Sequence, residues 1–189
     1  MIRSAIAALV FALTAAPAAA QAGKTSPGAG PVIVFETAKG TIEVETYPNE
    51  APKTVAHILA LVKRNFYNGL RVHRVAKNFV VQFGDPQTRD MTKKETWGRG
   101  PGAGSGKPIG AAEMHKNRPH KLGAVAMAHA GNPAQADSQI YITLRPTPEL
   151  NRNYAVWGQV ISGMDVVQKI EVGDIIKRAS VKGAAAATQ

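Results

Sequence analysis

The pattern of apolar and polar positions predicts a β-hairpin followed by a helix. Residues 32–35 form an apolar run, and residues 41–45 alternate apolar and charged side chains beyond a turn at residues 38–40. In residues 51–65 the apolar side chains recur at helical spacing, and Pro52 is tolerated in a first turn. The chain therefore opens with two paired strands and one amphipathic helix.

Strand patterns continue after this helix, with one long interruption. Residues 70–75 and 79–83 predict two strands joined by a turn, whereas residues 85–122 are polar and glycine-rich, a loop length that is usually functional or mobile. Later segments predict four strands and a short second helix: strands 124–128, 139–143, 155–160 and 177–181, and helix 164–170. Because strands outnumber helices and do not alternate with them, the pattern favours an antiparallel β-barrel over a doubly wound sheet.

The N-terminus has the anatomy of an export signal. Arg3 gives a basic start, residues 5–13 an apolar run and residues 18–20 a small-residue cleavage site. The apolar run is shorter than the roughly 20 residues that cross a bilayer as a helix. We expect residues 1–20 to be a signal peptide and the mature protein to be exported, in the first place to the periplasm, with outright secretion as the alternative.

Composition divides the rest of the chain. Small and polar residues predict a flexible linker at residues 21–31 and a disordered tail at residues 183–189. Residues 32–182 then form one domain, as a length of 189 residues suggests. The chain has no cysteine, which excludes disulfides and thiol chemistry, so burial must hold this domain together.

The chain is strongly basic, with 23 Lys and Arg against 13 Asp and Glu and a formal net charge of +10. Such an excess is typical of proteins that bind phosphates in nucleic acid. The basic residues are spread along the chain, however, no nucleic-acid motif is present, and an exported protein is separated from nucleic acid. We expect no nucleic-acid partner and a monomer, with weak contact to anionic envelope surfaces as a milder expectation.

Motifs of the common catalytic sites are missing from the sequence. It contains no P-loop, no G-x-S-x-G elbow and no His-Glu-x-x-His pair. The five histidines lack metal-ligand spacing with any cysteine. We therefore expect neither a metal nor a cofactor.

Residues 72–85, Val-His-Arg-Val and then Phe-Val-Val-Gln-Phe-Gly-Asp after a turn, resemble the cyclophilin family of peptidyl-prolyl isomerases. Further blocks resemble the family in the same order: residues 51–55, 66–69, 126–128, 137–142, and 150–151 with 154–158. The resemblance implies a mainly β fold, a closed eight-stranded antiparallel β-barrel capped by two α-helices. It also implies an isomerase that acts on X-Pro bonds in exported proteins and assists their folding.

The residue types suit this chemistry. Rotation about a prolyl bond faces a barrier of about 18–20 kcal/mol because amide resonance must be broken, although no bond is made or cut. A useful catalyst holds the proline ring and stabilises the twisted amide better than the planar one. Arg74 offers five fixed hydrogen-bond donors and a permanent charge. We therefore predict that Arg74 is the central catalytic residue.

Strand alternation and the resemblance together define the rest of the site. Alternation places Gln139 and Tyr141 on one face of their strand and Ile140 and Ile142 in the core. The resemblance implies a proline pocket, a glutamine that positions Arg74, and contacts to the residues before proline; His73 is expected to be structural. The predicted catalytic residues are Arg74, Phe79 and Gln82, and the predicted substrate-binding residues are Val80, Ala128, His129, Gln139, Tyr141, Leu150 and Tyr154.

Several positions depart from the family pattern, four of them at the site and its rim. Val80, His129, Glu149 and Tyr154 stand where the family often has Met, Asn, Trp and His. Val80 keeps the pocket apolar, and Tyr154 can donate a hydrogen bond as His would. Because the Trp position is associated in the family with binding of cyclosporin, Glu149 predicts weak inhibition. The alternative function is a non-catalytic proline-peptide-binding or chaperone module on the same fold.

Overall fold

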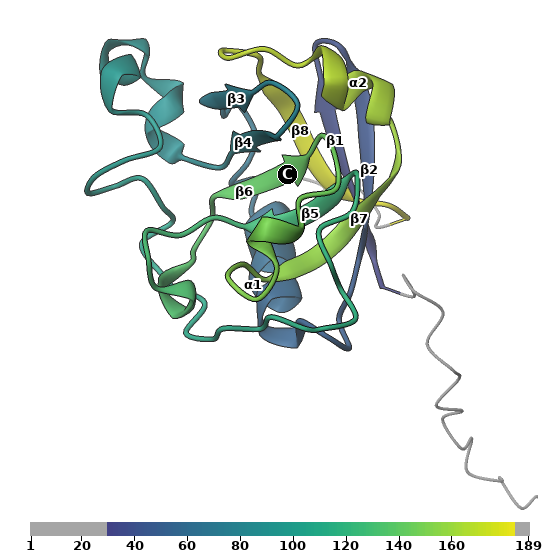
Figure 1. Ribbon diagram of the computed structural model, residues 1–189. Coiled ribbons are helices and arrows are strands. Elements are labelled where there is room, and N and C mark those ends of the chain that lie inside the picture. The colour runs from purple at the N-terminus through teal and green to yellow at the C-terminus, as the bar shows by residue number, and fades with distance from the viewer. Residues whose placement is uncertain (1–29, 184–189) are drawn as a thin grey trace, which may run out of the picture.

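A computed structural model describes residues 30–183 as a strongly curved antiparallel sheet with two α-helices (Figure 1). The expected signal peptide at residues 1–20 lies outside the described residues, as do most of the expected linker and tail. The strands are β1 (Val32–Thr37), β2 (Gly40–Thr46), β3 (Arg74–Ala76), β4 (Val80–Phe83), β5 (Ala124–Met127), β6 (Ile140–Thr143), β7 (Val156–Ser162) and β8 (Ile176–Val181). The helices are α1 (Pro52–Lys63) and α2 (Met164–Lys169), with 3₁₀ helices η1 (Pro86–Arg89), η2 (Met91–Thr96), η3 (Pro133–Gln135) and η4 (Pro148–Leu150).

Eight strands form one sheet in the order β3-β4-β6-β5-β7-β2-β1-β8. Each of its neighbouring pairs is antiparallel. This confirms the predicted mainly β, antiparallel architecture. Helix α1 contacts β8, and α2 contacts β2 beside the β1–β2 hairpin (Figure 1).

The sheet is an open half-barrel, so the predicted closed barrel is wrong. Strands β3 and β8 are the two edge strands of the sheet. One isolated β-bridge, between Arg71 and Ile175, links the segments that precede them. Of the predicted strand at residues 70–75 only Arg74 and Val75 lie in β3, which continues to Ala76. The physical reason is that residues 69–72 exchange backbone hydrogen bonds with residues 173–176, for example from Val72 N to Asp174 O at 2.8 Å, while His73 N alone continues toward β4, donating to Gln82 O at 3.2 Å.

Side-chain alternation divides the buried residues between the two faces of the sheet. Ile140 and Ile142 are fully buried in the main core, as predicted, where they join apolar side chains of α1 such as Ile58. Tyr141 and Val80 belong to a second, smaller apolar cluster on the opposite face. Because side chains of a strand point alternately to its two faces, one strand supplies both the core and this outer cluster.

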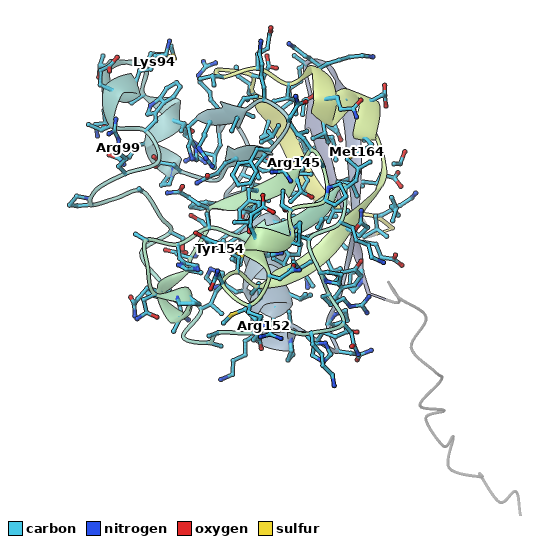
Figure 2. All side chains as sticks on the ribbon, in the orientation of Figure 1. Lys94, Arg99, Arg145, Arg152, Tyr154 and Met164 are labelled. Carbon is cyan, nitrogen blue, oxygen red and sulfur yellow. The ribbon has the colours of Figure 1, made fainter. Side chains whose placement is uncertain are left out.

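The long segment between β4 and β5 carries η1 and η2, which project away from the sheet (Figure 1). Figure 2 shows Lys94 and Arg99 on this projecting part. The buried carboxylate of Asp85 holds the start of the segment, since it accepts hydrogen bonds from Gln87 N at 2.8 Å and Gly98 N at 2.6 Å. Among residues 30–183 no helix combines the length and apolar character needed to cross a membrane.

Candidate active site

A row of cross-strand partners builds the site on the outer face of the sheet. Arg74 of β3 lies opposite Gln82 of β4, Gln82 opposite Tyr141 of β6, and Tyr141 opposite Ala126 of β5. Directly opposed residues in antiparallel strands point to the same face. Strand register therefore brings together side chains from three separate stretches of sequence.

A cavity of about 320 Å³ lies along this row. Its lining contains nine of the ten predicted site residues: Arg74, Phe79, Val80, Gln82, Ala128, His129, Tyr141, Leu150 and Tyr154. Val80 and Tyr141 are 1% and 4% exposed and form its apolar floor. Ligand pockets usually measure about 300–1,000 Å³, so this pocket suits a single small ring and its immediate neighbours.

Arg74 is exposed at the edge of this pocket and is held by a chain of amides. Its Nη1 donates to Gln82 Oε1 at 3.2 Å, and Gln82 Nε2 donates to Gln139 Oε1 at 2.9 Å. Gln139 Nε2 then donates to Ala103 O at 2.8 Å and, more weakly, to Gly98 O at 3.3 Å. Backbone carbonyls accept hydrogen bonds but cannot donate them, so they fix the orientation of both amides and present an oxygen to Arg74.

Aromatic rings form the walls of the pocket. The Arg74 guanidinium lies 5.8 Å from the centre of the Phe79 ring. The rings of His129 and Tyr154 stack with centroids 4.5 Å apart, and Tyr154 meets Tyr141 edge to face at 5.7 Å. Burial raises the pKa of Tyr141, so its hydroxyl stays protonated at neutral pH. The pocket therefore has an apolar floor and aromatic walls, with the charged Arg74 among its lining residues.

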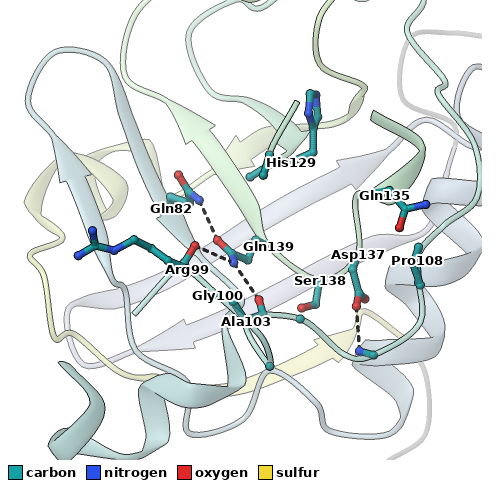
Figure 3. Close-up of a pocket in the computed structure, with 16 residues that line it drawn as sticks. Gln82, Arg99, Gly100, Ala103, Pro108, His129, Gln135, Asp137, Ser138 and Gln139 are labelled. Carbon is teal, nitrogen blue, oxygen red and sulfur yellow. Dashed lines mark hydrogen bonds between the residues drawn. The ribbon is translucent and has the colours of Figure 1, made fainter. Parts of the chain in front are cut away.

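Gln139, the tenth predicted residue, lies in a neighbouring cavity of about 610 Å³ (Figure 3). This cavity shares Gln82, Ala128 and His129 with the smaller one. The glycine-rich loop forms its other wall, with Arg99 and Ala103 among the lining residues. The predicted residues thus occupy two adjoining cavities.

Sequence reasoning did not identify the residue that anchors this wall. Asp137 accepts hydrogen bonds from Ser105 Oγ at 2.5 Å and Gly106 N at 2.9 Å, and its Oδ1 lies 3.3 Å from His57 Nε2. Burial alone would raise the pKa of Asp137, but the hydrogen bonds from His57, Ser105 and Gly106 lower it overall. The sequence signal that could have pointed to Asp137 was its position two residues before Gln139.

Two residues of the expected surroundings lie beside the pocket. His73 lines neither cavity, burial lowers its pKa, and the space beside its ring is closed by Gly98, where a Cβ would lie 2.7 Å from the imidazole. Glu149 pairs with Arg145 at 2.7 Å, and the Arg145 guanidinium lies 5.8 Å from the Phe79 ring centre. No sequence pattern indicated that Arg145 lies beside Phe79.

A curved antiparallel sheet with an apolar pocket on its outer face and an arginine at the pocket edge defines a cyclophilin-like protein. The family model described as cyclophilin type peptidyl-prolyl cis-trans isomerase/CLD matches residues 32–184. The chain therefore belongs to the cyclophilin-type peptidyl-prolyl cis-trans isomerase family, and it is an isomerase of this type.

Curated relatives and solved structures agree with this assignment. A probable peptidyl-prolyl cis-trans isomerase of Brucella abortus (strain 2308) is 38% identical over 181 residues, which cover 96% of this chain and 91% of that protein. A peptidyl-prolyl cis-trans isomerase of Helicobacter pylori is 37% identical over 145 residues, 76% of this chain and 82% of that protein. A cyclophilin-type isomerase of Cryptosporidium parvum, crystallised in the presence of the dipeptide Ala-Pro, has the same fold, with a TM-score of 0.68 at 23% identity over 81% of this chain and 99% of that chain.

Proposed function

We propose that this protein accelerates cis-trans rotation about X-Pro bonds in unfolded or partly folded exported polypeptides, with Arg74 as the central catalytic residue. The observation that carries the proposal is the 320 Å³ cavity, in which Arg74 stands at the edge of an apolar pocket. Family membership supports the reaction class.

The pocket holds the proline ring against Phe79, Val80 and Leu150, as the geometry of its lining suggests. In the planar ground state the prolyl nitrogen shares its lone pair with the carbonyl and accepts hydrogen bonds poorly. As the amide twists, that lone pair localises on nitrogen and becomes an acceptor for an Arg74 N–H. A donor that is used fully only in the twisted state lowers the barrier rather than merely tightening binding.

Residues before the proline extend, in this proposal, past Ala128 and His129 toward Gln139 and the larger cavity. Gln82 lines both cavities and bonds both Arg74 and Gln139, so it links the reacting bond to the preceding peptide. The Cryptosporidium parvum relative was crystallised with Ala-Pro, the shortest peptide of this kind.

Export, a monomeric state and weak adhesion to anionic envelope surfaces complete the proposal. The basic, apolar and small-residue regions of residues 1–20 support a signal peptide, and the formal charge of +10 supports adhesion. N-terminal sequencing of the protein recovered from the periplasm of a bacterial host tests the first point, because the mature chain should begin at Gln21.

A proline-peptide exchange assay by NMR tests the catalytic role. Arg74→Ala should lower the rate of catalysed exchange by about 100-fold, the typical cost of losing a preorganised transition-state donor. Arg178→Ala is the matched control, since Arg178 is exposed on β8 and lines neither cavity of the site. Equal exchange rates for the wild type and Arg74→Ala contradict the proposal, and peptide binding without acceleration by the wild type points to the non-catalytic module instead.

A further inference from the structure

His120 is a buried histidine that lies behind the proline pocket and lines neither site cavity. Its side chain is enclosed, with the residue only 2% exposed. Its Nδ1 lies 2.9 Å from Asn151 Oδ1, and its Nε2 lies 2.9 Å from the Tyr141 hydroxyl. The ring also stacks nearly parallel to Tyr141, with the ring centroids 5.9 Å apart and an interplanar angle of 10°.

For a neutral imidazole, one arrangement of hydrogens satisfies this chain of contacts. The backbone N–H of His120 donates to the same Asn151 atom at 2.9 Å, so that atom must be the carbonyl oxygen of the amide. An oxygen of this kind cannot donate, and Nδ1 of His120 must therefore carry a hydrogen. In a neutral imidazole Nε2 is then an acceptor, and the Tyr141 hydroxyl donates to it.

The neutral form agrees with the surroundings of His120. Burial lowers the pKa of this histidine, while the hydrogen bond to Asn151 and the charge of Glu149 act in the opposite direction. The facing hydroxyl of Tyr141 is itself buried and protonated, because burial raises its pKa.

The two partners of His120 belong to different walls of the proline pocket. Tyr141 lines the pocket from β6, and Asn151 directly follows Leu150, which lines it from η4. The backbone of His120 adds a further tie to this second wall, since Thr147 N donates to His120 O at 2.9 Å. One buried ring therefore joins a sheet residue to a loop segment that the strand ladder does not hold.

We propose that His120 is a positioning residue for the isomerase: as the neutral Nδ1–H tautomer it holds Tyr141 and the Leu150–Asn151 segment at the separation that a proline ring requires. The inference rests on the proposed function of the pocket. Dispersion contacts weaken strongly when a gap of even 0.5–1 Å opens. Loosening one wall should therefore weaken binding of the ring in both its planar and twisted states, which raises KM more than it lowers kcat.

NMR of the mature protein labelled with nitrogen isotope in its histidines tests the arrangement without any activity measurement. We expect His120 to be in the Nδ1–H tautomer at neutral pH, with its signals assigned by their disappearance in His120→Gln. An Nε2–H tautomer for His120 overturns the proposal, because Nε2 could then not accept from Tyr141.

Kinetics on proline peptides test the consequence for the pocket. His120→Ala should raise KM about fivefold, the size expected from one lost buried hydrogen bond, with kcat changed much less. His120→Gln should recover most of the loss, because its amide oxygen can accept from the Tyr141 hydroxyl. Tyr141→Phe removes the same hydrogen bond but keeps the ring, and it should raise KM about threefold. This variant therefore tests the positioning role of His120 even if His120→Ala does not fold.

Asn68→Ala is the control for a general loss of stability. Asn68 Oδ1 accepts a hydrogen bond from Ala179 N at 2.8 Å, and Asn68 lines neither site cavity, so this variant should lose stability and keep its KM. Wild-type KM in Tyr141→Phe, or the same rise of KM in Asn68→Ala, overturns the proposal. A wild type that binds proline peptide but does not accelerate exchange contradicts the proposed catalysis and leaves the positioning role to be judged separately. The tautomer of His120 and the effect of Tyr141→Phe on peptide affinity then decide that role.

Discussion

Arg74 and Gln82 face each other across the β3–β4 ladder, and the guanidinium of Arg74 donates to the Gln82 amide oxygen at 3.2 Å. Cross-strand pairing fixes the two backbones, and the hydrogen bonds of Gln139 to loop carbonyls fix the amide. The direction of the arginine thus depends on Gln82 of β4, on Gln139 directly before β6, and on the glycine-rich loop.

Gln82→Ala should lower kcat/KM by about tenfold, because Arg74 keeps its charge but loses the group that orients it. Thermal unfolding should change little, since Gln82 is half-buried and belongs to neither apolar core cluster. The exchange assay measures the first quantity, with Gln168→Ala on the exposed face of α2 as control. Undiminished activity in Gln82→Ala contradicts a positioning role for the amide.

Cyclosporin should bind weakly, and Glu149→Trp should strengthen its binding by at least about tenfold. Glu149 is 47% exposed and paired with Arg145, so an apolar cyclic peptide would cover a charged pair and offer no new hydrogen bonds. Calorimetric titration of both forms checks this, with Glu171→Trp as a control away from the pocket. Tight binding to the wild type contradicts the expectation.

Asp137→Asn should loosen the glycine-rich wall of the larger cavity. The carboxylate accepts from Ser105 and Gly106, and an amide replaces one of the two acceptor oxygens by a donor. Amide hydrogen exchange at residues 104–107 should become faster, by about tenfold for a loss near 1.4 kcal/mol. Asp165→Asn, which alters an exposed ion pair on α2, should leave these amides unchanged. Unaltered exchange at residues 104–107 in Asp137→Asn shows that other contacts hold the wall.

Stability should fall as the pH drops below about 6.5, the value for an unfolded histidine. Burial lowers the pKa of both His73 and His120, so over this window the unfolded chain binds more protons than the folded one. The charge of Asp85 opposes the shift at His73 and that of Glu149 opposes it at His120. The stability contributed by the neutral imidazoles is present above about pH 6.5 and is lost as the pH falls through the folded pKa values.

Urea unfolding between about pH 7.5 and 5.5 measures this loss. Two histidines can lower the free energy of unfolding by at most about 2.7 kcal/mol per pH unit. His120→Gln should show a shallower dependence, since one of the two groups no longer titrates. A free energy of unfolding that is constant across this range contradicts the lowered pKa values of His73 and His120.

The sequence by itself determined which face each strand residue occupies. Alternation assigned Ile140 and Ile142 to the core and Tyr141 to the opposite face, and helical spacing located α1 to within two residues at either end. These features could be predicted because the side-chain period is a property of the local backbone. The order of the family motifs along the chain then predicted the ten site residues, and the structure places them in two adjoining cavities.

Only the tertiary structure decided how distant segments meet. It left the sheet open between β3 and β8, anchored the glycine-rich wall on Asp137, brought Arg145 to Phe79 and placed His120 behind Tyr141. No local pattern encodes these contacts, because each depends on which of several backbone and side-chain partners is nearest once the whole core has packed. Periodicity specified the faces, and packing of the entire chain specified the partners.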